Sequence, residues 1–176
     1  MDLLIFLFIT IINNLSHYFN YKKPKNLIIK KMSGKISQPI VVAVSGGFDP
    51  LHIGHVRMFQ EAKKAGDKLI VIINNDHWLR KKKGHEFMPQ EERVEIIKAL
   101  ECVDEVILTN HSENPADMSV CESLRQIKPN IFANGGDRKE DNTPEHQVCA
   151  ELGIKMIFNI GGGKIQSSSW LISRSK

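Results

Sequence analysis

The chain has 176 residues, of which 41% are hydrophobic and 25% charged, with 12 glycines and 7 prolines. This length suits one globular domain, and the composition excludes collagen-like, coiled-coil and low-complexity chains. The three cysteines, Cys102, Cys121 and Cys149, form no C-x-x-C pair. We therefore expect reduced, structural thiols in a cytoplasmic protein, with neither a disulfide framework nor a cysteine zinc site.

The net charge of +4 is concentrated at the N-terminus. Residues 1–36 contain six of the 24 lysines and arginines but only one of the 20 acidic residues, which leaves 18 basic and 19 acidic residues in the rest of the chain. A protein that binds nucleic acid is expected to carry a basic face on its folded domain. The near-neutral body therefore predicts no nucleic-acid partner, although a small anionic ligand fits it.

The first residues form a short apolar run that is followed by lysines. The apolar run, residues 1–12, is shorter than the roughly 20 residues that a membrane span needs, and it lacks the basic start and cleavage site of a secretory signal. It could be a membrane-proximal anchor, a degenerate signal or an extension upstream of a start at Met32, and we favour the extension. We therefore predict an extension over residues 1–36 and one domain over 37–176, with membrane contact only if the extension is translated.

From Ile40 onward, continuous apolar runs alternate with stretches whose apolar residues have helical spacing. Such runs are typical of strands that are buried on both faces of a parallel sheet. The predicted strands are residues 40–44, 68–74, 105–108, 130–134 and 155–160, and the predicted helices are 54–65, 89–100, 119–127, 143–152 and a short one from Ser167. This alternation predicts a single doubly wound, Rossmann-like α/β domain with a five-stranded, mainly parallel sheet.

In such sheets, ligands bind beyond the carboxyl ends of the strands, where loops run into helix starts. The loops at these positions are residues 45–55, 75–84, 134–138 and 161–169, and they contain glycines, histidines and lysines. The sequence therefore predicts that one edge of the sheet carries the functional site.

The first of these loops has the residue types of an anion site. Gly46 and Gly47 allow a tight turn or a close approach of the backbone to a ligand. His52 and His55 lie three residues apart on the opening turn of a helix, so they share one face, and Gly54 leaves that face open. Imidazoles beside the unpaired N–H groups of a helix start favour an anion, with phosphate as the leading candidate. One histidine could instead be a helix cap, and a metal pair lacks a third ligand at a fitting spacing.

No other phosphate-binding pattern in the chain fits as well. The dinucleotide pattern G-x-G-x-x-G is absent from the sequence. Gly163-Lys164 is followed by Ile165, at a position where a P-loop needs Ser or Thr. The sequence therefore excludes a Walker-type phosphate site.

Residues 46–55 read Gly-Gly-Phe-Asp-Pro-Leu-His-Ile-Gly-His, which resembles the signature of the H-x-G-H nucleotidyltransferases, the cytidylyltransferase-like superfamily. The resemblance runs from about residue 40 to 172 and includes the order of the elements, the Glu92-Arg93 pair, a Gly-Gly-Asp loop at 135–137 and serines at 167–169. The Gly-Gly-Asp loop is most similar to that of heptose-phosphate adenylyltransferases, followed by glycerol-phosphate cytidylyltransferases.

The resemblance implies the transfer of CMP or AMP from CTP or ATP to a phosphorylated sugar or polyol, with release of pyrophosphate. It also implies Mg²⁺ bound with the nucleoside triphosphate, and a possible homodimer. Flavin- or pantetheine-phosphate adenylyltransferases share the histidine motif and are the alternative enzymes, and a non-catalytic nucleotide-binding regulatory module is a third possibility. Residues 111–117 are polar, which fits a hydroxyl-rich acceptor better than a flavin ring.

The resemblance also implies residue roles. His52 and His55 would bind the triphosphate and stabilise charge on the α-phosphate and the leaving group, and Lys83 and Arg93 would complete the catalytic set. The implied nucleotide-binding residues are Gly46, Gly47, Phe48, Asp49, Gly54, Lys82, Gly135, Asp137, Lys164, Ser167, Ser168 and Ser169, and no residue is predicted to ligate a metal. Asp49 is expected to fix the loop rather than to act as a base. Separately, Trp170 is predicted to pack in the core.

Overall fold

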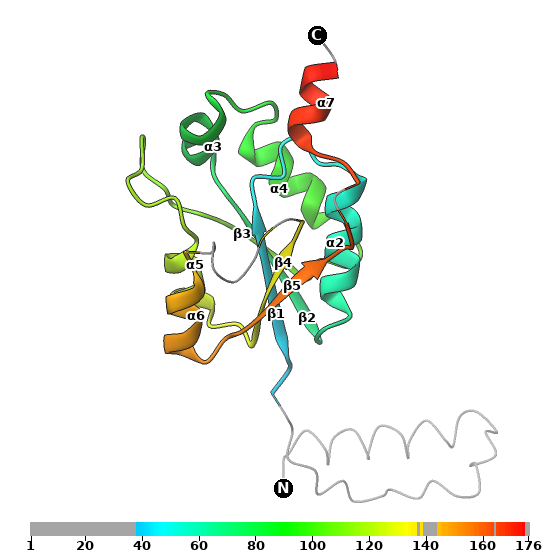
Figure 1. Cartoon of the computed structure of the whole chain (residues 1–176), viewed down its shortest axis with the longest axis vertical. Coiled ribbons are helices and arrows are strands. Elements are labelled where there is room, and N and C mark those ends of the chain that lie inside the picture. The colour runs from blue at the N-terminus through cyan, green and yellow to red at the C-terminus, as the bar shows by residue number, and fades with distance from the viewer. Residues whose placement is uncertain (1–37, 137, 139–143, 164, 175–176) are drawn as a thin grey trace, which may run out of the picture. The chain divides into compact units, whose positions relative to one another are not determined.

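Five short apolar segments form the strands of one sheet in the computed structural model, which describes residues 38–136, 138, 144–163 and 165–174. The strands are β1 (Val41–Gly46), β2 (Lys68–Ile73), β3 (Glu105–Leu108), β4 (Ile131–Gly135) and β5 (Lys155–Ile160). They run parallel in the order β3-β2-β1-β4-β5 (Figure 1). The predicted α/β fold is confirmed, and the sheet is parallel throughout. The extension predicted for residues 1–36 lies outside the described residues.

Helices cover both faces of this sheet. They are α2 (Ile53–Lys63), α3 (Asp76–Lys83), α4 (Gln90–Lys98), α5 (Cys121–Ile127), α6 (His146–Leu152) and α7 (Ser168–Arg174). None of the helices in the described part of the chain is long and apolar enough to cross a membrane.

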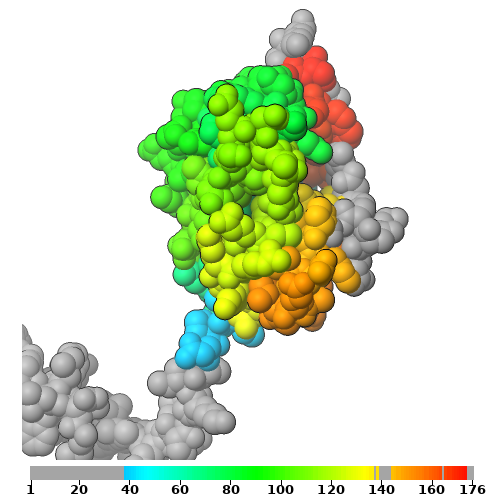
Figure 2. All heavy atoms as spheres, turned by 90° about the vertical axis from the view of Figure 1, so that its left-hand side faces the viewer, coloured from blue at the N-terminus to red at the C-terminus, as the bar shows by residue number. Residues whose placement is uncertain are grey.

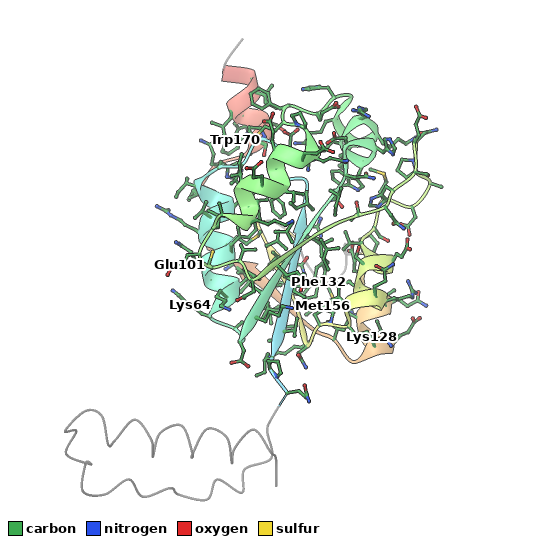
Figure 3. The ribbon with its side chains drawn as sticks, turned by 180° about the vertical axis from the view of Figure 1, so that it is seen from behind. Lys64, Glu101, Lys128, Phe132, Met156 and Trp170 are labelled. Atoms are coloured by element: carbon green, nitrogen blue, oxygen red, sulfur yellow. The ribbon has the colours of Figure 1, made fainter. Side chains whose placement is uncertain are left out.

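Alternate residues of β1 pack on opposite sides of the sheet, as the two-residue repeat of a strand requires. Val42 and Val44 belong to a buried cluster with Phe59 of α2 and Ile97 of α4. Ala43 belongs to the other buried cluster, which contains Phe132 of β4 together with Leu124 of α5 and Val148 of α6 (Figure 3). The strands are therefore buried on both faces, which is why they read as continuous apolar runs.

The chain leaves β1 toward β2 and β3 on one side and returns to β4 and β5 on the other. The strand order therefore reverses between β1 and β4, and this reversal opens a crevice beyond the carboxyl ends of these two strands. The loops that follow β1 and β4 meet at this point. The topology thus positions the functional site before any side chain is considered.

Helix α3 was not predicted, because residues 75–84 were interpreted as a loop. Only Leu79 of this helix is buried, so it has no apolar stripe to detect. Its ends do carry signals, since Asn75 Oδ1 accepts a hydrogen bond from Trp78 N at the start and Gly84, with φ of +85°, ends the helix. Asn75 is a favoured helix cap and glycine adopts the left-handed conformation without steric cost.

Candidate active site

Helix α2 begins with two histidines that cap it with their own rings. His52 is the N-cap residue, and its Nδ1 accepts a hydrogen bond from Gly54 N at 3.2 Å. His55 Nδ1 accepts in turn from His52 N at 3.3 Å. A neutral imidazole that accepts at Nδ1 carries its proton on Nε2. Both histidines therefore have an Nε2–H donor that is bonded to no acceptor among the described residues.

The two rings are stacked, with centroids 3.6 Å apart and planes 18° from parallel. The Phe48 ring packs against the His55 ring in an edge-to-face arrangement, with centroids 5.0 Å apart. The pKa of His55 is lowered to about 3, mainly by burial and further by the nearby charges of His52 and Lys83. The pKa of His52 is also lowered, mainly by burial. Both imidazoles are therefore neutral hydrogen-bond donors at neutral pH.

The low pKa of His55 makes stability depend on pH. In the unfolded chain His55 titrates near its ordinary pKa of 6.5, so between pH 6.5 and about 3 the unfolded state binds a proton that the folded state does not. We expect the free energy of unfolding to fall as the pH is lowered through this window, by up to about 1.4 kcal/mol per pH unit. Urea denaturation of wild type and His55→Gln at about pH 7 and about pH 5 checks this. If the free energy of unfolding changed equally between these two pH values in the two proteins, the low pKa assigned to His55 would be contradicted.

Lys83, the last residue of α3, places its ammonium group at the site. Its Nζ donates to Asp49 O at 2.8 Å. Burial is the main cause that lowers the pKa of Lys83, and the Arg93 charge lowers it further, while Asp49 opposes the shift. Lys83 lines the pocket beyond the carboxyl end of β1, whereas Lys82, which was predicted to bind the nucleotide, is exposed and does not line it.

These groups line a pocket of about 330 Å³ at the carboxyl ends of β1, β4 and β5. The pocket brings together the predicted residues Gly46, Gly47, Phe48, His52, Gly54, His55, Lys83, Gly135, Ser167, Ser168 and Ser169. It is also lined by Ser45, Met58, Asn134, Gly136, Arg138, Ile160, Gly161, Gly162, Gly163, Ile165 and Gln166. Asp137 and Lys164, which were predicted to bind the nucleotide, lie outside the described residues.

Met58 was missed by the sequence reasoning, although it lies one helical turn beyond His55 on the same face of α2. A Cβ on Gly135 would lie 2.5 Å from Met58 Sδ, and a Cβ on Gly161 would lie 2.9 Å from Met58 Cα. The last residue of β4 and the first residue after β5 are therefore glycines at positions where the chain passes directly against α2. The three-residue spacing from His52 through His55 to Met58 was the available signal.

Asp49 does not line the pocket. Its side chain is buried, with Oδ2 accepting from Phe87 N at 2.8 Å and Oδ1 from Met88 N at 2.7 Å. Both carboxylate oxygens thus hold the segment before α4. The prediction that Asp49 binds the nucleotide is corrected, and its expected role in fixing the loop agrees with these contacts.

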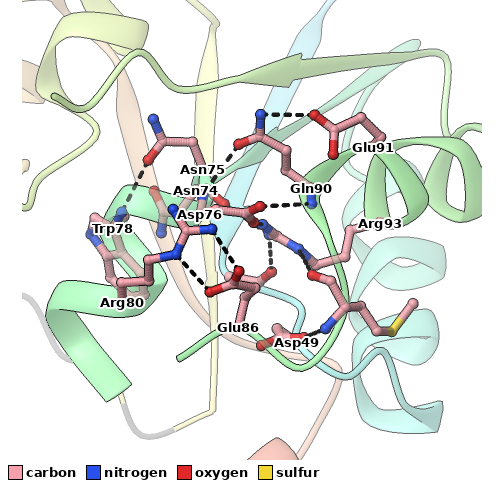
Figure 4. Close-up of polar contacts among 12 residues, drawn as sticks. Asp49, Asn74, Asn75, Asp76, Trp78, Arg80, Glu86, Gln90, Glu91 and Arg93 are labelled. Carbon is pink, nitrogen blue, oxygen red and sulfur yellow. Dashed lines mark hydrogen bonds and ion pairs between the residues drawn. The ribbon is translucent and has the colours of Figure 1, made fainter. Parts of the chain in front are cut away.

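Arg93, which was predicted to complete the catalytic set, is likewise inside the protein and does not line the pocket, so the prediction of a direct catalytic role is corrected. It is 1% exposed, and Asp76 Oδ1 lies 2.6 Å from one guanidinium nitrogen. The remaining groups donate to the carbonyl oxygens of Gly47, Asn74 and Met88 at 2.7, 2.8 and 3.0 Å (Figure 4). A guanidinium group that is paired with these partners has no face left for a substrate.

The serines at the start of α7 reach the pocket from the C-terminal end of the chain. Ser168 Oγ donates to Pro50 O at 3.0 Å, which ties α7 to the loop that carries the histidines. Trp170 on the same helix is 47% exposed, so its predicted place in the core is wrong (Figure 3). The start of α7 thus helps to build the pocket, while Trp170 lies at the surface.

A second pocket of about 250 Å³ lies beyond β3, at the same edge of the sheet. Its lining is rich in hydroxyl, amide and carboxylate groups and consists of Thr109, Asn110, His111, Ser112, Pro115, Ala116, Asp117, Ser119, Glu122 and Ser123. Figure 2 looks onto the side of the domain where this segment lies next to α5 and α6. No lysine, arginine or large aromatic residue lines it.

The parallel sheet presents two neutral imidazole donors and an ammonium group to one crevice, which are donor groups of the kind that a phosphate group would need. A family model described as "Cytidylyltransferase-like" matches residues 43–157, which is more than half of the chain. The chain therefore belongs to the cytidylyltransferase-like family, and it is an enzyme of the nucleotidyltransferase class.

Similar proteins agree with this assignment. The chain is 35% identical over 118 residues to the FAD synthase of Pyrococcus abyssi, covering 66% of this chain and 76% of that protein. It is also 35% identical to the bifunctional protein HldE of Desulfatibacillum aliphaticivorans, covering 67% of this chain but only 23% of that protein. The crystal structure of a lipopolysaccharide core biosynthesis protein from Thermoplasma volcanium superposes with a TM-score of 0.57 at 28% identity, covering 69% of this chain and 97% of that one.

Proposed function

We propose that this enzyme transfers AMP from ATP, or alternatively CMP from CTP, to the phosphate of a small acceptor and releases pyrophosphate. The observation that carries the proposal is the pair of Nε2–H donors on His52 and His55 in the crevice beyond β1. AMP is favoured because FAD, the product named in the FAD synthases, contains an AMP unit.

In the proposed reaction, an oxygen of the acceptor phosphate attacks the α-phosphorus, and the bond from that phosphorus to the bridging oxygen of the β-phosphate breaks. The electron pair of the broken bond leaves with pyrophosphate. A phosphate monoester is already ionised at neutral pH, so no base is needed. Asp49, the carboxylate of the histidine loop, already accepts hydrogen bonds from two backbone N–H groups. The two imidazole N–H groups and the Lys83 ammonium would stabilise the charge that develops on the phosphates.

We propose that the triphosphate enters together with Mg²⁺. Nowhere in the described residues do three histidine, cysteine, aspartate or glutamate side chains gather as a metal site. Mg²⁺ commonly keeps several waters and binds through substrate phosphates. We therefore propose that the ion is part of the substrate, held by phosphate oxygens and water.

For the acceptor we propose a phosphorylated sugar or polyol. The pocket beyond β3 carries four hydroxyl side chains, those of Thr109, Ser112, Ser119 and Ser123, together with two carboxylates. Such groups suit hydrogen bonds with several ligand hydroxyls, and the pocket has no large aromatic surface on which a flavin ring could stack. Flavin phosphate is the second candidate, and it is supported by the FAD synthases at 35–38% identity.

The experiment that tests this proposal measures pyrophosphate release. ATP, CTP, GTP and UTP are each combined with a panel of sugar, polyol, flavin and pantetheine phosphates. We expect release with ATP or CTP and one sugar or polyol phosphate. Release with flavin phosphate alone would favour the second candidate. Nucleotide binding without turnover across the panel would contradict the proposal and favour a regulatory module.

A further inference from the structure

Arg93 is the largest fully buried side chain of the described residues. It joins three segments that are far apart in sequence, namely the loop after β1, the end of β2 and the segment before α4. Its charge is balanced by Asp76, whose other oxygen accepts from Gln90 N at 3.3 Å (Figure 4). This one side chain therefore sets the positions of three loops.

One of its partners belongs to the histidine loop. The Gly47 carbonyl accepts from the Arg93 guanidinium at 2.7 Å and is thereby directed into the protein. A trans peptide unit is planar, so its N–H points opposite to its C=O. The N–H of Phe48, which belongs to the same peptide unit, therefore points away from buried Arg93. Gly47 and Phe48 both line the pocket.

The Phe48 N–H has no hydrogen-bond acceptor among the described residues. Phe48 also adopts a φ of +51°, in the left-handed region that is unfavourable for a residue with a side chain. Its ring is fixed between His55 and Phe59, with centroids 5.0 Å from each. The surrounding structure must therefore hold Phe48 in this conformation. The ring contacts with His55 and Phe59 and the hydrogen bond from Arg93 to the Gly47 carbonyl do so.

We infer that Arg93 is a positioning residue that orients the Gly47–Phe48 peptide so that its N–H donates to the triphosphate beside the two histidines. This inference rests on the proposed function. Arg93 acts through the peptide and touches no substrate. Lysine cannot replace it, because a single ammonium group cannot reproduce the planar, multiply bonded geometry of the guanidinium group.

Selective labelling can report on this peptide alone. Gly47–Phe48 is the only Gly-Phe pair in the chain, so carbonyl-¹³C glycine combined with ¹⁵N phenylalanine gives one amide signal, that of Phe48. Met58–Phe59 is the only Met-Phe pair, and ¹³C methionine with the same ¹⁵N label gives the amide of Phe59 inside α2 as an internal control. The probes are α,β-methylene-ATP and α,β-methylene-CTP, and calorimetry on the same samples measures binding.

In the wild-type enzyme we expect bound nucleotide to shift the Phe48 amide proton downfield, and the Phe59 signal to stay nearly unchanged. In Arg93→Lys we expect kcat to fall on the order of 100-fold, with a much smaller change in KM, and the Phe48 shift to disappear. Arg80→Lys is the matched control, because Arg80 forms an exposed ion pair with Glu86 and does not line the pocket.

Nucleotide binding that leaves the Phe48 amide unmoved in the wild type would overturn the inference and leave the proposed function standing. An Arg93→Lys enzyme with kcat within about threefold of wild type would overturn it as well. Absence of nucleotide binding by calorimetry would overturn the proposed function, and the inference with it. If Arg93→Lys does not fold, the Phe48 amide of the wild-type enzyme still tests whether this N–H contacts the nucleotide.

Discussion

Replacement of His55 by alanine is expected to lower kcat by about 10²- to 10³-fold, because the variant loses one of two preorganised donors aimed at developing phosphate charge. KM for the nucleotide is expected to rise less than kcat falls, since the donor is neutral and acts most strongly when negative charge increases in the transition state. Steady-state kinetics of pyrophosphate release measure both parameters.

His85→Ala is the control for this experiment, because His85 is an exposed histidine outside the pocket. We expect it to retain the kinetics of the wild-type enzyme. The catalytic role of His55 would be contradicted if His55→Ala kept its kcat, or if it lost activity only because it had unfolded. His55 Nδ1 also accepts from His52 N, so the thermal midpoint of the variant must be measured alongside its activity.

Replacement of Arg93 by methionine is expected to lower the free energy of unfolding by about 3–5 kcal/mol. Methionine roughly fills the space but donates no hydrogen bond, so the Asp76 carboxylate loses its cationic partner and three carbonyl groups lose the Arg93 donor. A loss of this size is a large part of the roughly 5–15 kcal/mol by which domains are typically stable. Urea denaturation measures it directly.

Arg80→Met provides the matched comparison, since the Arg80 pair with Glu86 is exposed and such pairs contribute little. We expect its urea midpoint to stay close to that of the wild-type protein. Equal midpoints for the two methionine variants would show that the buried network does not stabilise the fold, and would contradict the structural role assigned to Arg93.

The strands were predictable because the sheet is buried on both faces, so each strand reads as an apolar run whose ends were placed within about two residues. Helix α3 was not predictable in this way, since only Leu79 faces the interior and four consecutive cations end the helix. Its two caps, Asn75 and Gly84, were visible in the sequence but lay at the edges of what resembled a polar loop.

The histidines were predicted correctly as pocket residues, because their spacing and the preceding glycines are local features. Their hydrogen bonds are also local, and they leave each capping imidazole with its Nε2–H free of any acceptor among the described residues. Arg93 was misjudged because its role depends on carbonyl groups up to 46 residues away in sequence. A cation encoded near a phosphate motif suggests a contact with the ligand. Only the fold shows that the partners of Arg93 are groups of the protein itself.

The most direct test of the central claim follows the phosphorus atoms of the nucleotide. The enzyme is incubated with an acceptor that supports pyrophosphate release and with ATP labelled with ³²P at either the α or the γ position. Nucleotidyl transfer predicts that the α label appears in the acceptor product and the γ label in pyrophosphate. Transfer of the γ label to the acceptor would mean that the enzyme is a phosphoryl-transfer kinase, and would contradict nucleotidyl transfer as its reaction.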